Sequence, residues 1–178
     1  MKRLIIPMSA LDYIKTRKRI WLKILIALVP AVAVGYCLNV FEFKEGILIA
    51  DVFKDFVNVQ ISAIAILISF SIAIITILVS ADNPNIKKLK GRHSEDCKPL
   101  NGQKLNLFQV LLSNITYNVI IEVVYLIILI FYIFLQLFVP DEWYKTLMAI
   151  SVFFVIHILH ILLESVAQMY LTFWKHED

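Results

Sequence analysis

Four long stretches without a charged residue constrain the fold of this chain more than any other feature. They cover residues 24–41, 56–81, 123–140 and 146–163. A helix needs about 20 mainly apolar residues to cross a bilayer, so each stretch provides one crossing once the residues at its ends are included. Backbone polar groups inside lipid must bond within their own segment, which favours helices. The sequence therefore predicts an all-α membrane protein with four transmembrane helices.

The overall composition agrees with this prediction. Hydrophobic residues make up 60% of the chain and charged residues 17%, whereas a soluble domain has about 45–50% and about 25%. The length of 178 residues suits a single membrane domain. No A-x-A-like cleavage site follows the first apolar stretch, so we interpret it as a retained span. Cys37 lies in an apolar segment and Cys97 in a polar loop, so we expect no disulfide between them.

Turn residues, charges and amphipathic patterns divide this domain into segments. The stretch SALD at 9–12 resembles a capping box, so we expect a helix to begin there. The predicted order is an interfacial cytoplasmic helix at 9–19, span 1 at 20–41, an extracytoplasmic amphipathic extension at 46–58, span 2 at 56–81, a basic cytoplasmic loop at 82–104, a helix at 105–140 that includes span 3, and span 4 at 143–174. In the extension, Phe53 and Val57 lie on an apolar face, largely opposite Asp51 and Lys54.

Lysine and arginine are concentrated in alternate connections. Residues 1–19 contain six of them and residues 82–104 contain six more, whereas the other two connections contain only Lys44, Lys54 and Lys145. Cytoplasmic segments of membrane proteins carry this excess of positive charge. We therefore expect both termini to lie in the cytoplasm.

Two of the spans carry polar residues along one helical face. Each residue turns a helix by about 100°, so positions three or four apart share a face. In span 4 this face contains His157, His160, Glu164 and Gln168. In span 3 it contains Asn114, Asn118, Glu122, Tyr125, Tyr132 and Gln136. Because polar groups in lipid are costly, such faces turn toward a bundle interior or a wet cavity. Span 1 has no comparable face, so we expect it to lie mostly against lipid.

Span 2 carries a face of small and hydroxyl side chains. Its members are Ser62, Ala65, Ser69, Ala73, Thr76 and Ser80. Small residues at this spacing allow close packing of helices or line a narrow path. Both interpretations stay open at this point.

The predicted orientation places Glu122 and Glu164 near the cytoplasmic ends of their spans, level with Lys23. His157 and His160 lie deeper, where they would make conductance or assembly respond to pH near about 6–7. One interpretation is simple pairing, with Lys23 neutralising a glutamate and Gln or Tyr satisfying the histidines. The other is a pore in a homo-oligomer, with the glutamates as an acidic mouth that favours cations. The pore-lining candidates are Ser62, Ser69, Thr76, Asn118, Glu122, Tyr125, Tyr132, Gln136, His157, His160 and Glu164.

Two clusters of basic residues fall on the predicted cytoplasmic side. They comprise Lys15, Arg17, Lys18 and Arg19, and Lys87, Lys88, Lys90 and Arg92. The simpler interpretation is that they set the topology and contact anionic lipid headgroups. The alternative is that they bind a phosphate-rich ligand such as a nucleotide or oligonucleotide.

Catalytic motifs do not stand out in this sequence. It contains no GxSxG, Walker A or GxGxxG motif, so we predict that the protein is not an enzyme and expect no cofactor. The spacing His157-x2-His160-x3-Glu164 leaves a small metal- or haem-binding protein as a third interpretation. It is disfavoured because zinc takes three or four protein ligands, and the remaining histidines, His93 and His176, lie outside the spans.

A short basic head, a second span rich in small residues (ISAIAILISFSIAIITILVS), a basic loop and two further spans resemble the compact Hailong-type effectors of bacterial anti-phage systems. This resemblance implies an oligomeric pore that depolarises the bacterial inner membrane. It also implies a gating nucleotide or oligonucleotide made by a partner nucleotidyltransferase. We therefore expect a ligand-gated membrane channel, and the alternative is a non-conducting anchor or accessory subunit of a larger complex.

Overall fold

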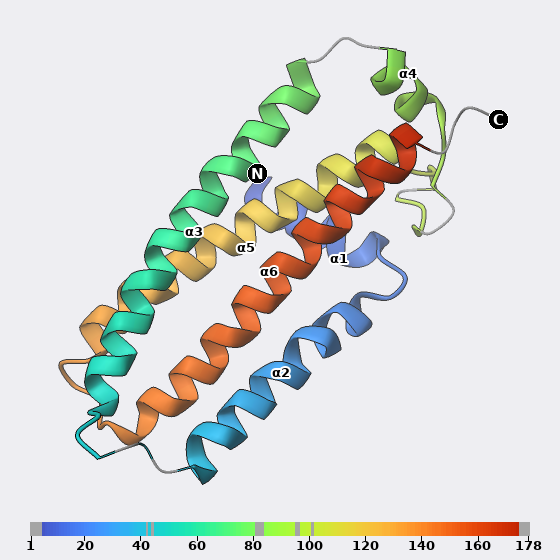
Figure 1. Cartoon of the computed structure of the whole chain (residues 1–178). Helices are drawn as coiled ribbons and strands as arrows, with labels where there is room; N and C mark the ends of the chain where they lie inside the picture. The colour runs from blue at the N-terminus through green and yellow to red at the C-terminus, as the bar shows by residue number, and fades with distance from the viewer. Residues whose placement is uncertain are drawn as a thin grey trace.

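The computed structural model describes residues 5–41, 43, 45–80, 84–94, 97–100 and 102–174. In this part of the chain the regular structure is helical, and only isolated bridges join extended segments. The helices are α1 (Ile5–Thr16), α2 (Ile20–Val40), α3 (Ile49–Ser80), α4 (Pro84–Gly91), α5 (Leu107–Leu135) and α6 (Glu142–Trp174) (Figure 1). Helices α2, α3, α5 and α6 are each long and apolar enough to cross a membrane. The prediction of an all-α fold with four membrane-length helices is therefore confirmed.

The amphipathic extension predicted at 46–58 and the span predicted at 56–81 form one continuous helix, α3. No proline or glycine interrupts it, so its backbone hydrogen bonds continue from the extension into the span. Phe53 and Val57 are fully buried, whereas Asp51 and Lys54 are exposed. The predicted division of this segment into an apolar and a polar face is thus confirmed.

The loop predicted at 82–104 contains a short helix, α4, which the sequence prediction missed. Pro84 is its first residue, where a missing N–H costs nothing, and Lys88 and Lys90 lie in its last turn, near the negative end of the helix dipole. Ile86 and Leu89 are buried, and α4 packs against α5. Pro84 and Gly91, which the prediction treated as helix breakers, are therefore the first and last residues of a helix.

Residues in or next to the first turns of α1 and α5 have side chains that suit a helix start. α1 covers Ile5–Thr16 and so includes residues before the predicted start at residue 9. Pro7 is compatible with the first turn, because the N–H that proline lacks would have no helical partner there. α5 begins at Leu107 with a capping box. In it the Gln109 N–H donates to the Asn106 side chain at 2.7 Å, and the Asn106 N–H donates to the Gln109 side chain at 3.0 Å.

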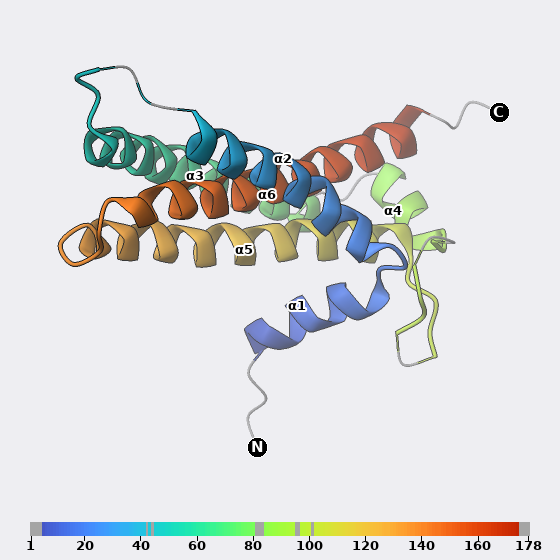
Figure 2. The same ribbon diagram turned by 90° about the horizontal axis from the view of Figure 1, so that it is seen from below.

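Helix α5 lies at the centre of the bundle. It packs against α3, α6, α1 and α4, and α6 packs in addition against α2 and α3. Figure 2 shows α1 beside α5, outside the group of four long helices. The consecutive helices α1 and α2 therefore pack on different partners: α1 on α5, and α2 on α6.

Small residues allow the close contact between α2 and α6. Ala27 and Ala31 are the buried residues of α2. A Cβ atom added at Gly35 would lie 3.2 Å from the Cβ of Ala149 in α6, so the two backbones approach closely at this point. Most other apolar side chains of α2, such as Val29, are exposed, which agrees with the expectation that this span lies mostly against lipid.

The two ends of the bundle differ in chemistry. The end where α1 joins α2, α4 follows α3, α5 begins and α6 terminates is called the basic end below (Figure 1). A large apolar core fills the half toward the opposite end and contains Phe53, Val57, Ile64, Tyr125, Leu129, Tyr132, Tyr144, Met148 and Ile158. Near the basic end, smaller apolar clusters flank buried polar side chains.

Candidate functional site

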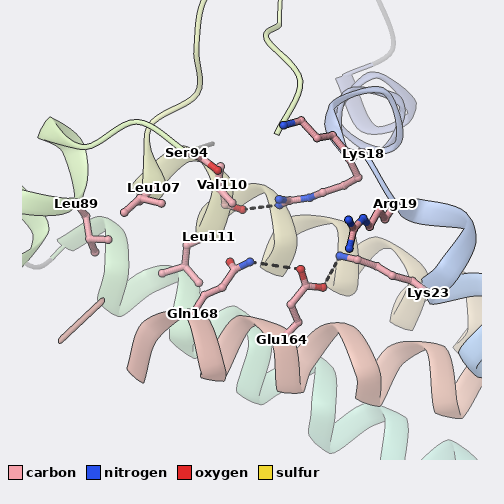
Figure 3. Close-up of a pocket in the computed structure, with 11 residues that line it drawn as sticks. Lys18, Arg19, Lys23, Leu89, Ser94, Leu107, Val110, Leu111, Glu164 and Gln168 are labelled. Atoms are coloured by element: carbon pink, nitrogen blue, oxygen red, sulfur yellow. Dashed lines mark hydrogen bonds and ion pairs between the residues drawn. The ribbon is translucent and has the colours of Figure 1, made fainter. Parts of the chain in front are cut away.

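A pocket of about 600 Å³ opens at the basic end, where five structural elements meet (Figure 3). The junction of α1 and α2 provides most of its charge, and α4, the start of α5, the end of α6 and the segment between α4 and α5 provide the remaining walls. Its lining residues are Arg17, Lys18, Arg19, Lys23, Leu89, Ser94, Leu107, Val110, Leu111, Glu164 and Gln168. Four cations and one carboxylate give the lining a formal charge of 4 − 1 = +3.

The structure divides the eight basic residues predicted to bind ligand into two groups. Arg17, Lys18 and Arg19 line the pocket, whereas the other five are exposed and lie outside its lining: Lys15, Lys87, Lys88, Lys90 and Arg92. The Nζ atom of Lys90 lies 4.9 Å from the centre of the Phe108 ring. The α4 helix contributes an apolar wall, Leu89, and not its lysines, to the pocket.

Arg17 is a buried structural residue as well as a member of the pocket wall. Its side chain is 7% exposed. Its guanidinium donates to the backbone oxygen of Val110 at 3.0 Å, to Cys97 Sγ at 2.9 Å and to Asn114 Oδ1. These bonds attach the α1–α2 junction to α5 and to the segment before it. Planar guanidinium groups suit such multiple recognition.

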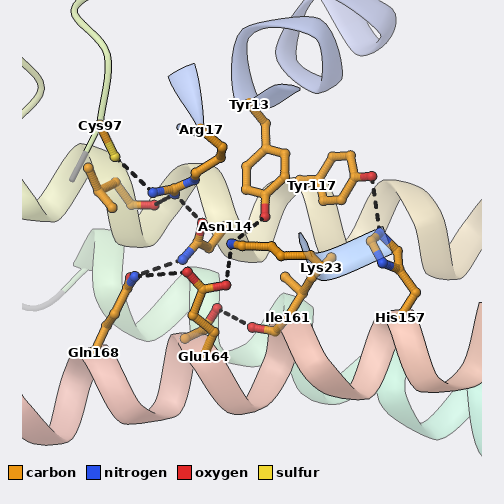
Figure 4. A network of polar contacts seen from close by, with 12 residues as sticks. Tyr13, Arg17, Lys23, Cys97, Asn114, Tyr117, His157, Ile161, Glu164 and Gln168 are labelled. Carbon is orange, nitrogen blue, oxygen red and sulfur yellow. Dashed lines mark hydrogen bonds and ion pairs between the residues drawn. The ribbon is translucent and has the colours of Figure 1, made fainter. Parts of the chain in front are cut away.

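An ion pair between Lys23 and Glu164 joins α2 to α6 at the pocket (Figure 4). The Lys23 Nζ also donates to the Tyr13 hydroxyl at 3.1 Å. This contact confirms the simpler interpretation for Glu164, namely neutralisation by Lys23. Since the pair is largely removed from solvent, with side-chain exposures of 13% and 26%, it is screened less than a surface pair.

Amide side chains extend this ion pair into a network that crosses the bundle (Figure 4). Gln168 Nε2 donates to Glu164 Oε1 at 3.3 Å, and Asn114 Nδ2 donates to Gln168 Oε1 at 2.9 Å. Asn114 in turn accepts from Arg17. A continuous chain of polar contacts therefore runs from Arg17 through α5 and α6 to Lys23 and back to α1.

The aromatic ring of Tyr13 packs against this network. Tyr13 was not among the site residues predicted from the sequence. Its ring stacks on that of Tyr117, with centroids 4.0 Å apart, and lies within cation–π distance of Arg17 and Lys23. Burial, assisted by the negative charge of Glu164, raises the pKa of Tyr13 above its usual range. The phenol is therefore neutral at ordinary pH. The sequence pattern of α1 contains no periodic signal that shows Tyr13 facing α5, so sequence reasoning missed this residue.

The two predicted histidines have different environments. His157 is buried, and its Nε2 lies 3.3 Å from the Tyr117 hydroxyl. His160 is only partly buried. The Tyr117 hydroxyl thus provides the tyrosine contact that the pairing interpretation expected, at one of the two ring nitrogens of His157. Among the residues that the structure describes, no group of three or more His, Cys, Asp or Glu side chains converges as metal ligands would. His176 lies outside those residues.

Glu122 lies inside the bundle, away from the pocket. It is fully buried and accepts from Asn118 Nδ2 at 2.7 Å and from Ser71 Oγ of α3 at 3.1 Å. Glu164, its predicted companion, is held by Lys23 on another face. In one chain the two carboxylates therefore do not form an open acidic mouth.

The remaining predicted polar residues of α5 face the interior of the same chain. Tyr125 and Tyr132 are buried in the large apolar core, where the Tyr125 ring stacks on Phe154 with centroids 5.1 Å apart. Gln136 is half-buried at the C-terminal cap of α5. Most of the polar face of span 3 is thus a packing surface inside a single chain.

The small-residue face of α3 points the other way. Ser62, Ser69 and Thr76 are exposed, together with the alanines between them and Ser80. At about 100° per residue this face lies about 180° from the buried residues Ile64 and Ser71. The three hydroxyls donate to the carbonyl four residues earlier at 3.0–3.1 Å, a bonding pattern that hydroxyl side chains use inside helices.

No family model, curated protein or solved structure matches this chain. Function is therefore inferred from the geometry of the basic pocket, the polar network behind it and the outward face of α3.

Proposed function

We propose that the protein is a multi-pass, homo-oligomeric channel whose basic pocket binds a phosphate-bearing ligand on the cytoplasmic side of a bacterial inner membrane. The observation that carries the proposal is the gathering of Arg17, Lys18, Arg19 and Lys23 in one pocket with a formal charge of +3. Arginine and lysine are the side chains that bind phosphate oxygens, through charge-assisted hydrogen bonds. A volume of about 600 Å³ falls within the range of small-molecule sites.

The orientation follows from the distribution of positive charge. The basic end carries both basic clusters, whereas the opposite end has only Lys44, Lys54 and Lys145. Cytoplasmic segments carry such an excess. The pocket and both termini are therefore assigned to the cytoplasm, where phosphorylated metabolites and anionic headgroups are both present.

The channel part of the proposal rests on the outward face of α3. The predicted pore-lining residues Asn118, Glu122, Tyr125 and Tyr132 of α5 are buried within one chain, so they are not available to a ring of subunits. The face of Ser62, Ser69 and Thr76 is exposed along a membrane-length helix. Cyclic symmetry would place copies of this face around one axis and form rings of hydroxyl groups. We accordingly keep α3 as the pore-lining helix and assign the α5 residues to the interior.

The resemblance to Hailong-type effectors supplies the physiological part of the proposal. Ligand binding would open the pore and depolarise the membrane during phage infection, with the ligand made by a partner nucleotidyltransferase. Cells that express the protein with that partner are expected to lose membrane potential and to form fewer phage plaques. Unchanged potential and plaque numbers would contradict the defence role and leave the pocket proposal untouched.

Ion flux through liposomes tests the channel. Ser69→Leu would narrow and dry the pore, so flux should fall at least about tenfold. The matched control is Phe70→Leu, an exposed neighbour that is turned by about 100° around the same helix. Equal flux from the wild type and both variants would contradict lining by α3. No flux from the wild type, with or without ligand, would favour the non-conducting accessory subunit, whose partner would cover the same face.

Binding of pyrophosphate, measured by calorimetry on the full chain in neutral detergent, tests the pocket. Replacing Lys18 and Arg19 together by alanine should weaken binding at least about tenfold, because each removes a charge-assisted bond. Lys15→Ala is the control, since Lys15 is exposed on α1 but lies outside the pocket lining. Equal losses in both variants would indicate general surface attraction and overturn the site.

A second arm separates a soluble ligand from a lipid headgroup. Nanodiscs of phosphatidylglycerol and of phosphatidylcholine differ in the charge of the headgroup. If the pocket binds an anionic lipid headgroup, phosphatidylglycerol nanodiscs will suppress pyrophosphate binding and zwitterionic phosphatidylcholine nanodiscs will not. A soluble ligand predicts the same pyrophosphate affinity in both.

A further inference from the structure

One carboxylate lies among the cations that line the basic pocket. Glu164 comes from α6, and the other charged members of the lining are Arg17, Lys18, Arg19 and Lys23. The Oε2 atom of Glu164 forms the ion pair with Lys23, and Oε1 accepts from Gln168 at 3.3 Å. Both carboxylate oxygens are therefore engaged at the wall of the pocket (Figure 3).

A carboxylate and a phosphate compete for the same donor. Each accepts charge-assisted hydrogen bonds from an ammonium group. A phosphate that enters the pocket meets a Lys23 whose charge is already neutralised, and it also meets the negative charge of Glu164. Like charges at short range repel, and the effect is large in a site that is partly removed from water.

We propose that Glu164 is an internal counter-ion of the basic pocket, which the phosphate-bearing ligand must displace from Lys23. This inference rests on the proposed function of the pocket and names how that site is regulated. In the ligand-free protein, Glu164 occupies the position of an anion and keeps Lys23 ordered. In the bound protein, the phosphate takes over Lys23.

Displacement of Glu164 would act on more than the pocket. The ion pair ties α2 to α6 at the basic end, and Glu164 also belongs to the chain of contacts through Gln168 and Asn114 to Arg17. Once Lys23 leaves Glu164, the end of α6 loses its polar tie to α2. Ligand binding is thereby linked to the position of a membrane-length helix.

The test is pyrophosphate binding by the full chain, compared between the wild type, Glu164→Gln and Glu142→Gln. Glutamine keeps the shape of the side chain and removes its charge. We expect Glu164→Gln to bind at least about tenfold more tightly, which corresponds to about 1.4 kcal/mol. Glu142→Gln is the matched control, because Glu142 is an exposed carboxylate in the first turn of the same helix, at the opposite end. Its affinity should equal that of the wild type.

The outcomes separate this inference from the proposed function. Wild-type binding without a gain in Glu164→Gln overturns the counter-ion role and leaves the pocket proposal standing. Absence of binding in the wild type and in Glu164→Gln overturns the pocket and the inference together. Binding by Glu164→Gln alone supports the inference. Glu164→Ala serves as a second variant, and thermal unfolding of each purified variant verifies that the fold is intact. A gain that Lys23→Gln abolishes in the Glu164→Gln background assigns it to Lys23.

Discussion

Arg17 donates a hydrogen bond of 3.0 Å to the backbone oxygen of Val110, although the two residues are 93 positions apart in the chain. This bond joins the α1–α2 junction to the first turns of α5. Arg17 is therefore a buried link between two parts of the fold, because its guanidinium has little contact with solvent. The packing of α1 against α5 and the wall of the basic pocket therefore depend on the same side chain.

Removal of Arg17 is expected to destabilise the protein. Arg17→Gln leaves Val110 O or Asn114 Oδ1 without its donor, and an unpaired buried polar group costs about 1–3 kcal/mol. The measurement is thermal unfolding in detergent. Arg19→Gln is the control, since Arg19 is exposed and surface changes usually lie within about 0.5 kcal/mol. Equal melting temperatures for both variants would show that the Arg17 contacts contribute nothing.

Alkaline pH should reveal the environment of Tyr13. Its folded-state pKa is raised by burial above the usual 10.0, so the folded protein retains a proton that the unfolded chain loses. This contribution is complete below about pH 10 and is lost as pH rises from there through the folded-state pKa. Tyr13→Phe should therefore show a shallower loss of stability above about pH 10 than the wild type does. Parallel curves in urea unfolding would contradict this assignment.

Substitution of Glu122 should distinguish its hydrogen bonds from its charge. Glu122→Ala removes the acceptor of Asn118 Nδ2 and Ser71 Oγ, and we expect a loss of about 1–3 kcal/mol in unfolding free energy. Glu122→Gln keeps an acceptor and should remain much closer to the wild type. If both variants lose the same amount, the carboxylate charge is what the site requires.

The contact between α2 and α6 should tolerate no bulk at Gly35. A valine there would force its Cβ against Ala149, and overpacking of this kind costs about 1–3 kcal/mol. Gly91→Val is the control, because a Cβ at Gly91 has no atom within 4 Å. A tolerated Gly35→Val in detergent unfolding would indicate that the two helices separate more easily than the structure implies.

The four spans were predictable because hydropathy and length act locally. Most residues of the uncharged stretches lie in α2, α3, α5 and α6, and the amphipathic start of α3 follows from its own spacing. The direction of a polar face is different. Asn118 and Ser69 both lie on regular polar faces, yet the first is buried and the second exposed, because the neighbouring helices decide which face is covered.

Residues of the basic head show the same limit. Arg17 and Arg19 are close neighbours in a basic run, so the sequence predicted the same ligand-binding role for both. The structure buries Arg17 against Val110 and exposes Arg19. Tyr13 is identified as a site residue only by its contacts with Lys23 and Tyr117. These partners are remote in sequence, so no local pattern encodes them.

The packing of α1 on α5 also orders the events of biosynthesis. α1 and α2 leave the ribosome well before α5 exists, and 93 residues at about 5–20 residues per second take roughly 5–20 seconds. During this interval Arg17 has no Val110 to bind, and Tyr13 has no Tyr117 beneath it. Docking of α1 on α5 is thus a late step, because it depends on the synthesis of the third long helix of the chain.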